Sequence, residues 1–205
     1  MRKIKIYVEG VADAKLIKDL IFEWYQETMI FDQSGKNGLA NILITNGKTN
    51  LEKFKPLFKL NSDIDILSIV IFDADIFNDE NDKFIELKKE FPIEYFLLPD
   101  NQSNGDLETL LAKIINQDNE VIFKCWEGYE NCLKTSTRKE GVFTTPARKT
   151  KIYAYLEALL GESNSEKDLI KERDRNYRNT NHWDLNAPAL VNLKQFLDQY
   201  FQKLS

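Results

Sequence analysis

Two aspartates, Asp73 and Asp75, separated only by Ala74, directly follow the apolar run 67–72. The run is short, rich in Ile and Val and apolar on both faces, which predicts a central strand of a parallel sheet covered by helices. In such sheets, ligands bind at the carboxyl ends of the strands. Two carboxylates at that position, with no basic residue nearby in the sequence, are costly unless a cation joins them. These residue types therefore indicate a site for a divalent metal ion.

Further acidic residues follow two other predicted strands. Glu9 comes directly after the strand predicted at Lys3–Val8, and Asp106 and Glu108 follow the strand predicted at Ile93–Leu98. If the first and third strands are neighbours, Glu9 and the two aspartates face one crevice. Carboxylates hold Mg²⁺ through few direct bonds and leave water and phosphate oxygens to complete the octahedron. Such a site suits in-line attack on a phosphodiester.

The elements that must position these residues alternate along the chain. Strands are predicted at 3–8, 41–45, 67–72 and 93–98, with helices between them, a loop at 32–38 and a further helix at 106–115. This order predicts an α/β fold with a four-stranded parallel sheet and right-handed crossovers. The rest is helical in pattern, with helices at 119–133, 149–160 and 189–204 and loops at 134–146 and 161–165. We therefore expect an α/β core over 1–117 and a helical extension over 118–205 that packs on it.

Two short motifs in this order resemble a known domain. The segment VEGVAD at 8–13, followed by a helix and later by FDAD at 72–75, resembles the Toprim domain. That domain occurs in topoisomerases, bacterial primases, recombination mediators and overcoming-lysogenization-defect nucleases. The further pieces NGK at 46–48 and NGDLE at 104–108 look most like small stand-alone Toprim-like bacterial proteins. The resemblance covers about the first 115 residues and implies a three-layer, Rossmann-like sheet.

The resemblance implies a role for each matching acid. Glu9 would be the general acid/base, or a metal ligand through water. Asp73 and Asp75 would bind Mg²⁺ or Mn²⁺. Glu108, together with Asp106, would complete the acidic cluster, as a later carboxylate does in the nuclease branch.

Other parts of these enzymes have weaker counterparts. A later lysine assists the phosphate chemistry in some nucleases; Lys149 or Lys151 would correspond, and no motif fixes which. The sequence shows no tyrosine context of the topoisomerase kind and no zinc ribbon of the primase kind. It also has no phosphate-binding Gly-x4-Gly-Lys-Ser/Thr, so the ATPase part of the lysogenization nucleases is not present.

Each candidate residue also has a purely structural explanation. Glu9 stands where the dipole of the following helix favours an anion. Asp106 is better explained as a helix N-cap, whereas for Glu108 an ordinary first-turn position and a functional role are balanced. Asp73 is also suited to cap a turn, with Asp75 in solvent. Gly47 and Lys48 fit a turn between a strand and a helix better than a phosphate clamp.

The charge is unevenly distributed along the chain. The net charge is −5, but residues 138–178 carry +3 and residues 1–137 carry −8. An acidic half that could hold metal is thus joined to a basic segment that could hold phosphate. The alternating signs at 171–175 predict a solvated, salt-bridged face. Three basic residues are assigned as candidate nucleic-acid contacts: Lys48, Arg138 and Arg148.

Three functions compete on these observations. The first is Mg²⁺- or Mn²⁺-dependent hydrolysis of nucleic-acid phosphodiesters, with DNA favoured over RNA as the partner. The second is a non-catalytic Toprim-like module that binds nucleic acid or protein. The third, a phospho-accepting receiver domain, needs two acids after its first strand and a lysine after a fifth, and we discount it.

Composition bounds the class of protein. A chain with 42% hydrophobic and 30% charged residues is typical of a globular protein. No apolar run is long enough to span a bilayer, and the start lacks a signal-peptide core, so we expect a cytoplasmic protein with no membrane partner. Cys125 and Cys132 are expected to be packing residues, and a homodimer is left open.

Overall fold

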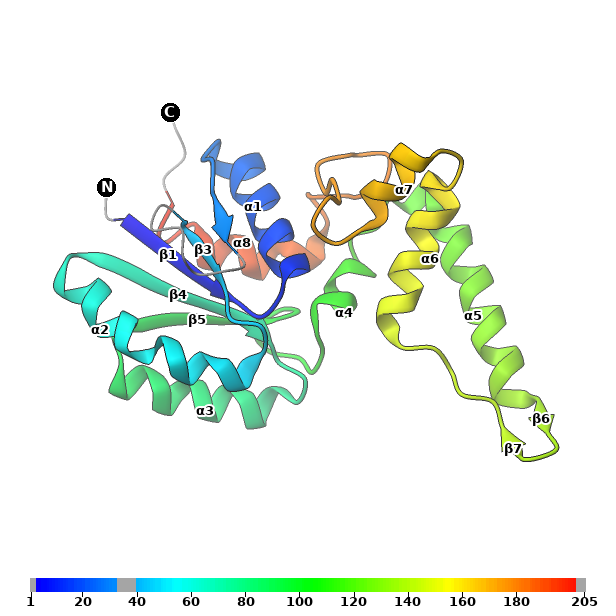
Figure 1. Ribbon diagram of the computed structural model, residues 1–205, viewed down its shortest axis with the longest axis horizontal. Coiled ribbons are helices and arrows are strands. Elements are labelled where there is room, and N and C mark those ends of the chain that lie inside the picture. The colour runs from blue at the N-terminus through cyan, green and yellow to red at the C-terminus, as the bar shows by residue number, and fades with distance from the viewer. Residues whose placement is uncertain (1–2, 33–39, 202–205) are drawn as a thin grey trace.

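A five-stranded parallel sheet forms the centre of the fold (Figure 1). The computed structural model describes residues 3–32 and 40–201. In spatial order the strands are β2 (Phe31–Asp32), β3 (Ile42–Ile44), β1 (Lys3–Val8), β4 (Ile66–Asp73) and β5 (Ile93–Leu98). The predicted α/β class and parallel sheet are confirmed, but the prediction of four strands is wrong. The additional strand β2 is a two-residue edge pairing with β3, too short to leave an alternation in the sequence.

Helices cover both faces of this sheet, which makes three layers. Helices α1 (Val11–Tyr25) and α8 (Val191–Leu197) pack on the face formed by Ile6 and its neighbours. The other face, formed by Tyr7 and its neighbours, is covered by α2 (Lys55–Asp63), the 3₁₀ segment η1 (Lys48–Phe54) before it, and α3 (Phe77–Glu90). Adjacent residues of β1 thus enter different cores, as the period of two of a strand requires.

The sheet register brings the predicted acidic residues to one edge. Val8 pairs with Ile44 of β3 and with Ile71 of β4, so the carboxyl ends of these strands lie level. Glu9 follows β1, and Asp73 is the last residue of β4. The neighbouring position of the first and third predicted strands, on which the shared crevice depended, is therefore confirmed.

The second half of the chain contains a projecting arm (Figure 1). After α4 (Leu107–Leu111) and η2 (Gln117–Asn119), helix α5 (Glu120–Thr135) and helix α6 (Arg148–Leu160) pack side by side. The short strands β6 (Thr137–Arg138) and β7 (Gly141–Val142) join them as a hairpin. Helix α7 (Asn164–Ile170) and the 3₁₀ segment η3 (Pro188–Leu190) then lead back to α8 on the sheet.

Several predicted boundaries in this half are wrong. The loop predicted at 134–146 contains the end of α5 and the β6–β7 hairpin, whose turn uses Gly141 at φ 124° in place of an Asn-Gly signal. Helix α4 ends at Leu111 instead of 115, and α7 begins inside the loop predicted at 161–165. The helix predicted at 189–204 is η3 followed by α8, and residues 202–204 lie outside the described residues, as do residues 33–38 of the loop predicted at 32–38.

Two predictions about burial are also wrong. Arg175, expected on a solvated face, is 2% exposed; its Nε donates to the carbonyl of Ile170 at 3.1 Å, and its guanidinium lies 4.8 Å from the centre of the Tyr153 ring. Cys125 and Cys132, expected to pack, are both exposed, because α5 packs mainly on α6 and buries only Phe123.

The predicted boundary between residues 117 and 118 stays a prediction. The last helix, α8, follows this boundary in the sequence but packs on the sheet together with α1. Next to it, Tyr25 stacks on Phe201 with ring centres 5.2 Å apart. In the part of the chain that the structure describes, none of the helices has the length and apolar character that crossing a membrane requires.

Candidate active site

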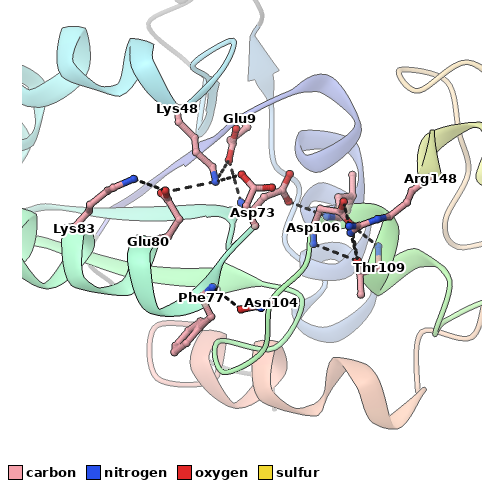
Figure 2. A network of polar contacts seen from close by, with 12 residues as sticks. Glu9, Lys48, Asp73, Phe77, Glu80, Lys83, Asn104, Asp106, Thr109 and Arg148 are labelled. Carbon is pink, nitrogen blue, oxygen red and sulfur yellow. Dashed lines mark hydrogen bonds and ion pairs between the residues drawn. The ribbon is translucent and has the colours of Figure 1, made fainter. Parts of the chain in front are cut away.

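Glu9 and Asp73 are held together at the carboxyl edge of the sheet (Figure 2). Oε1 of Glu9 accepts a hydrogen bond from the backbone N–H of Asp73 at 3.1 Å. Oδ1 of Asp73 accepts from the backbone N–H of Leu107, the first residue of α4, at 2.8 Å. These bonds fix both carboxylates on backbone groups of neighbouring elements, so the arrangement belongs to the fold and does not depend on a flexible loop.

Asp13 is a further acid of this site, and its position in the sequence indicated no chemical role. It is 7% exposed and is the third residue of α1. Its Oδ2 accepts from the N–H of Gly10 at 3.0 Å, the usual bond of a helix capping box, but its Oδ1 is buried and has no hydrogen-bond partner among the described residues. One oxygen explains the helix start, and the other is left for a ligand or water.

Burial, followed by neighbouring negative charges, raises the pKa of the carboxyls of the site. Burial, and then the charges of Asp13 and Glu9, raise the pKa of Asp73 to about 8. Burial, followed by the charge of Glu9, raises the pKa of Asp13 to about 7. Burial also raises the pKa of Glu9 and of Glu108. A group of acids that resist ionisation together is a site where a cation would be bound favourably.

Lys48 lies beside this group of acids (Figure 2). Its Nζ lies 2.6 Å from Oδ2 of Asp75, 3.8 Å from Oε2 of Glu80 and 3.9 Å from Oε1 of Glu9. Asp75, predicted as a metal ligand beside Asp73, therefore pairs with lysine, and its side chain is 64% exposed. The contribution of Glu80, from the first turn of α3, was missed because it lies seven residues beyond Asp73 in a segment that reads as an ordinary solvated helix.

Asp106 is an N-cap, as its sequence position predicted. Its Oδ1 accepts from the N–H of Thr109 at 2.8 Å, and its Oδ2 lies 2.9 Å from Nη1 of Arg148, at the start of α6. Both oxygens are thus occupied. Glu108, in the first turn of α4, is the more available of these two acids and contributes to the raised pKa of both Asp13 and Asp73.

The other predicted basic residues lie apart from the acids. Lys149 pairs with Glu172, and this hydrogen bond raises its pKa, with a smaller contribution from the charge of Glu108. Lys151 lies 3.2 Å from Glu127 and 4.1 Å from the centre of the Phe123 ring, so it joins α6 to α5. Arg138 is in the hairpin at the far end of the arm. Of the two lysines predicted to assist phosphate chemistry, Lys149 is the better candidate, because it interacts with Glu108 of the site.

Gly105 fixes the loop on which Asp75 sits. The backbone N–H of Asp75 donates to the carbonyl of Gly105 at 2.6 Å, and the N–H of Gly105 donates back at 3.1 Å. Gly105 has φ +148°, and an added Cβ would meet Oγ1 of Thr109 at 3.0 Å and Cδ of Pro99 at 3.1 Å. Only glycine therefore fits this position without strain.

We expect Gly105→Ala to lower the free energy of unfolding by about 1–3 kcal/mol, because the strained φ and the close Cβ contacts both oppose it. Urea unfolding followed by circular dichroism measures the change. Gly128→Ala is the matched control: it lies within α5, its added Cβ meets nothing within 4 Å, and it should be neutral or stabilising. Equal destabilisation by both substitutions would contradict the role given to Gly105.

The donor chemistry of the site suits a hard cation, but no complete metal cage is present. Among residues 3–32 and 40–201, no group of three or more His, Cys, Asp or Glu side chains is arranged to hold a metal ion. A groove of about 960 Å³ opens beside the acids between η1, α2 and α3, and it shares Lys48 and Glu80 with them. The site thus has buried acids on one side and, on the other, a groove lined by both lysines and glutamates.

Comparison with known proteins gives one match. A family model described as a protein of unknown function, DUF3226, matches residues 3–202, which is nearly the whole chain. Neither the curated proteins nor the solved structures provide a match.

Proposed function

Since the chain belongs to the family described as a protein of unknown function, DUF3226, we propose its activity from the site itself: Mg²⁺- or Mn²⁺-dependent hydrolysis of nucleic-acid phosphodiesters. The observation that carries the proposal is the convergence of Glu9, Asp13 and Asp73 from two adjacent strands and a helix start, each with a pKa that burial raises. Burying acids that repel one another costs stability, and a fold retains such a cost most readily where function needs it. The resemblance to Toprim nucleases supports the same reaction class.

The residues present fit a divalent cation by their chemistry. The unpartnered Oδ1 of Asp13 is an oxygen donor that the protein itself leaves unused. Mg²⁺ is usually held by one or two carboxylates and completes its octahedron with water and substrate phosphate oxygens, so a three-carboxylate cage is not required. Asp13 and Asp73 are the residues that would hold the ion, with Glu108 nearby. A bound ion would polarise the phosphate and offset the charge that develops on it.

The other residues of the site have distinct roles in this proposal. Glu9, whose pKa is raised by burial, would accept the proton of the attacking water, because a base with a pKa nearer neutrality is more effective. Lys48 would contact a phosphate oxygen of the substrate, exchanging its present partner Asp75 for the phosphate. Asp106 and Arg148 would hold α4 and α6 in place beside the site.

The test is cleavage of plasmid, single-stranded DNA and RNA in Mg²⁺ or Mn²⁺, with EDTA as the metal-free arm. Glu9→Gln retains the size of the side chain and an acceptor for the Asp73 N–H, and removes the base. We expect it to lower the rate about 100-fold. Lys48→Ala is expected to raise KM more than it lowers kcat, since it removes a binding contact. A wild-type protein inactive on all three substrates in both metals would contradict the proposal.

The second candidate function is a non-catalytic module that binds nucleic acid or protein. It is favoured by the net charge of −5 and by the pairing of Lys149 and Lys151 with Glu172 and Glu127, which leaves no lysine assigned to the phosphate chemistry. The same experiment separates the two candidates. Binding of nucleic acid that survives Glu9→Gln, without cleavage by any form of the protein, supports the module.

A further inference from the structure

The far end of the arm is exposed to solvent throughout. We define the arm tip as residues 137–143, which include the β6–β7 hairpin (Figure 1). Every residue of the tip is exposed, including Val142 at 64% and Phe143 at 39%. An isolated two-stranded hairpin is at best marginally stable, and this one buries no side chain that would anchor it. The tip therefore adds little to the stability of the fold and is available to a partner.

The charges of the tip differ from those of the rest of the arm. Elsewhere on α5 and α6, lysines are neutralised locally, in the pairs Glu120–Lys124, Glu130–Lys134 and Glu127–Lys151. At the tip, neither Arg138 nor Lys139 has an acidic partner within the described residues, and Arg138 lies 6.0 Å from the centre of the Phe143 ring. Glu140 is the single acid of the tip, which leaves a net charge of +1. The arm thus carries its uncompensated positive charge at its end.

We infer that the arm tip binds the backbone of duplex nucleic acid beside the candidate active site. Arginine and lysine without local partners are the groups that phosphate attracts, and threonine hydroxyls, here that of Thr137, also bond to phosphate. A two-stranded ribbon fits the major groove of a duplex, where exposed apolar side chains such as Val142 and Phe143 can contact base edges. The inference rests on the proposed function for its choice of partner, and its test uses binding alone.

The reach of the tip sets the length of duplex that it can contact. Residues 144–147 connect the tip to Arg148, whose Nη1 lies 2.9 Å from Asp106 at the site. Six Cα steps, from Val142 to Arg148, span at most about 20 Å. At about 3.4 Å per base pair, this is roughly six base pairs of duplex beyond the active-site edge. A duplex that extends at least about six base pairs beyond the site is therefore long enough to contact the tip.

The test is the binding of fluorescein-labelled DNA to the whole protein in EDTA, so that no cleavage occurs. We expect Arg138→Ala/Lys139→Ala to weaken binding of a 24-base-pair duplex about tenfold near 0.1 M salt, and to reduce the slope of log affinity against log salt by between about one and two. The control is Lys124→Ala/Lys134→Ala, which removes the same charge from the same arm at sites already paired.

Each other outcome overturns the inference. An equal loss in the control variant would mean that the overall charge of the arm, and not its tip, is responsible. Unchanged binding in the tip variant, or no binding of duplex by the wild type, would exclude the tip as a nucleic-acid contact. A tip variant that loses self-association in sedimentation, with no change in DNA binding, would assign the tip to a second copy of the chain. The nuclease proposal is tested separately by cleavage, so either idea can fail without the other.

Discussion

Asp73→Asn is expected to lower nucleic-acid cleavage at least about 1,000-fold while leaving the fold intact. Asparagine keeps the size of the side chain and an oxygen that can accept from the N–H of Leu107, and the N–H of residue 73 still donates to Glu9. What it removes is a negative charge at the site where a cation is proposed to bind. A 1,000-fold loss corresponds to about 4 kcal/mol of transition-state stabilisation, a reasonable value for a lost metal contact. The measurement is kcat/KM on a labelled DNA substrate in Mn²⁺.

The matched comparison for Asp73→Asn is the same substitution at Asp75. Asp75 was equivalent to Asp73 in the sequence, but its carboxylate pairs with Lys48 and is largely exposed. Asp75→Asn should therefore cost only about tenfold, through the altered position of Lys48. Asp63→Asn, at the exposed end of α2, should have no effect. If Asp73→Asn retained cleavage within tenfold of wild type, the acids at the sheet edge would not be the site of the reaction.

The fold class could be predicted from the sequence because its signals are local. The alternation of strands and helices, the apolar run of β4 and the acids that follow the strands are each visible within a few residues. The edge strand β2 and the hairpin at the arm tip could not be predicted in this way. Their strands are two residues long, and it is pairing with a partner strand, not an alternation of apolar residues, that defines them.

The candidate site was predicted in part for a similar reason. Glu9 and Asp73 are close because the register of β1 and β4 places them so, and both belong to recognisable motifs. Asp13 stands in the first turn of α1, where an acid needs no further reason, and its unpartnered oxygen is visible only in three dimensions. Arg175 shows the opposite error: alternating charges predicted a solvated segment, but the packing of the residues after α7 buries this one.

Asp13 also leads to a prediction about stability: in EDTA, the wild-type protein should become less stable as the pH rises from about 4 to about 8. The folded-state pKa values of Asp13 and Asp73, about 7 and about 8, lie above the ordinary values near 4. In this window the folded state binds more protons than the unfolded state, so the free energy of unfolding falls with rising pH. The loss is complete once the pH passes the folded pKa.

Asp13→Asn should remove much of this dependence. Asparagine keeps the acceptor for the N–H of Gly10 but cannot ionise, and without the charge of Asp13 the pKa of Asp73 should also fall. We expect the variant to match wild type near pH 4 and to exceed it by about 2–4 kcal/mol near pH 8, from about 1.4 kcal/mol per pH unit of a three-unit shift, reduced for relaxation of the site. Urea unfolding across this pH range, with exposed Asp63→Asn as the control, measures the difference. A wild-type protein whose stability rises from pH 4 to pH 8 would mean that these acids are already ionised and compensated in the folded state, which would remove the electrostatic reason for a cation at this site.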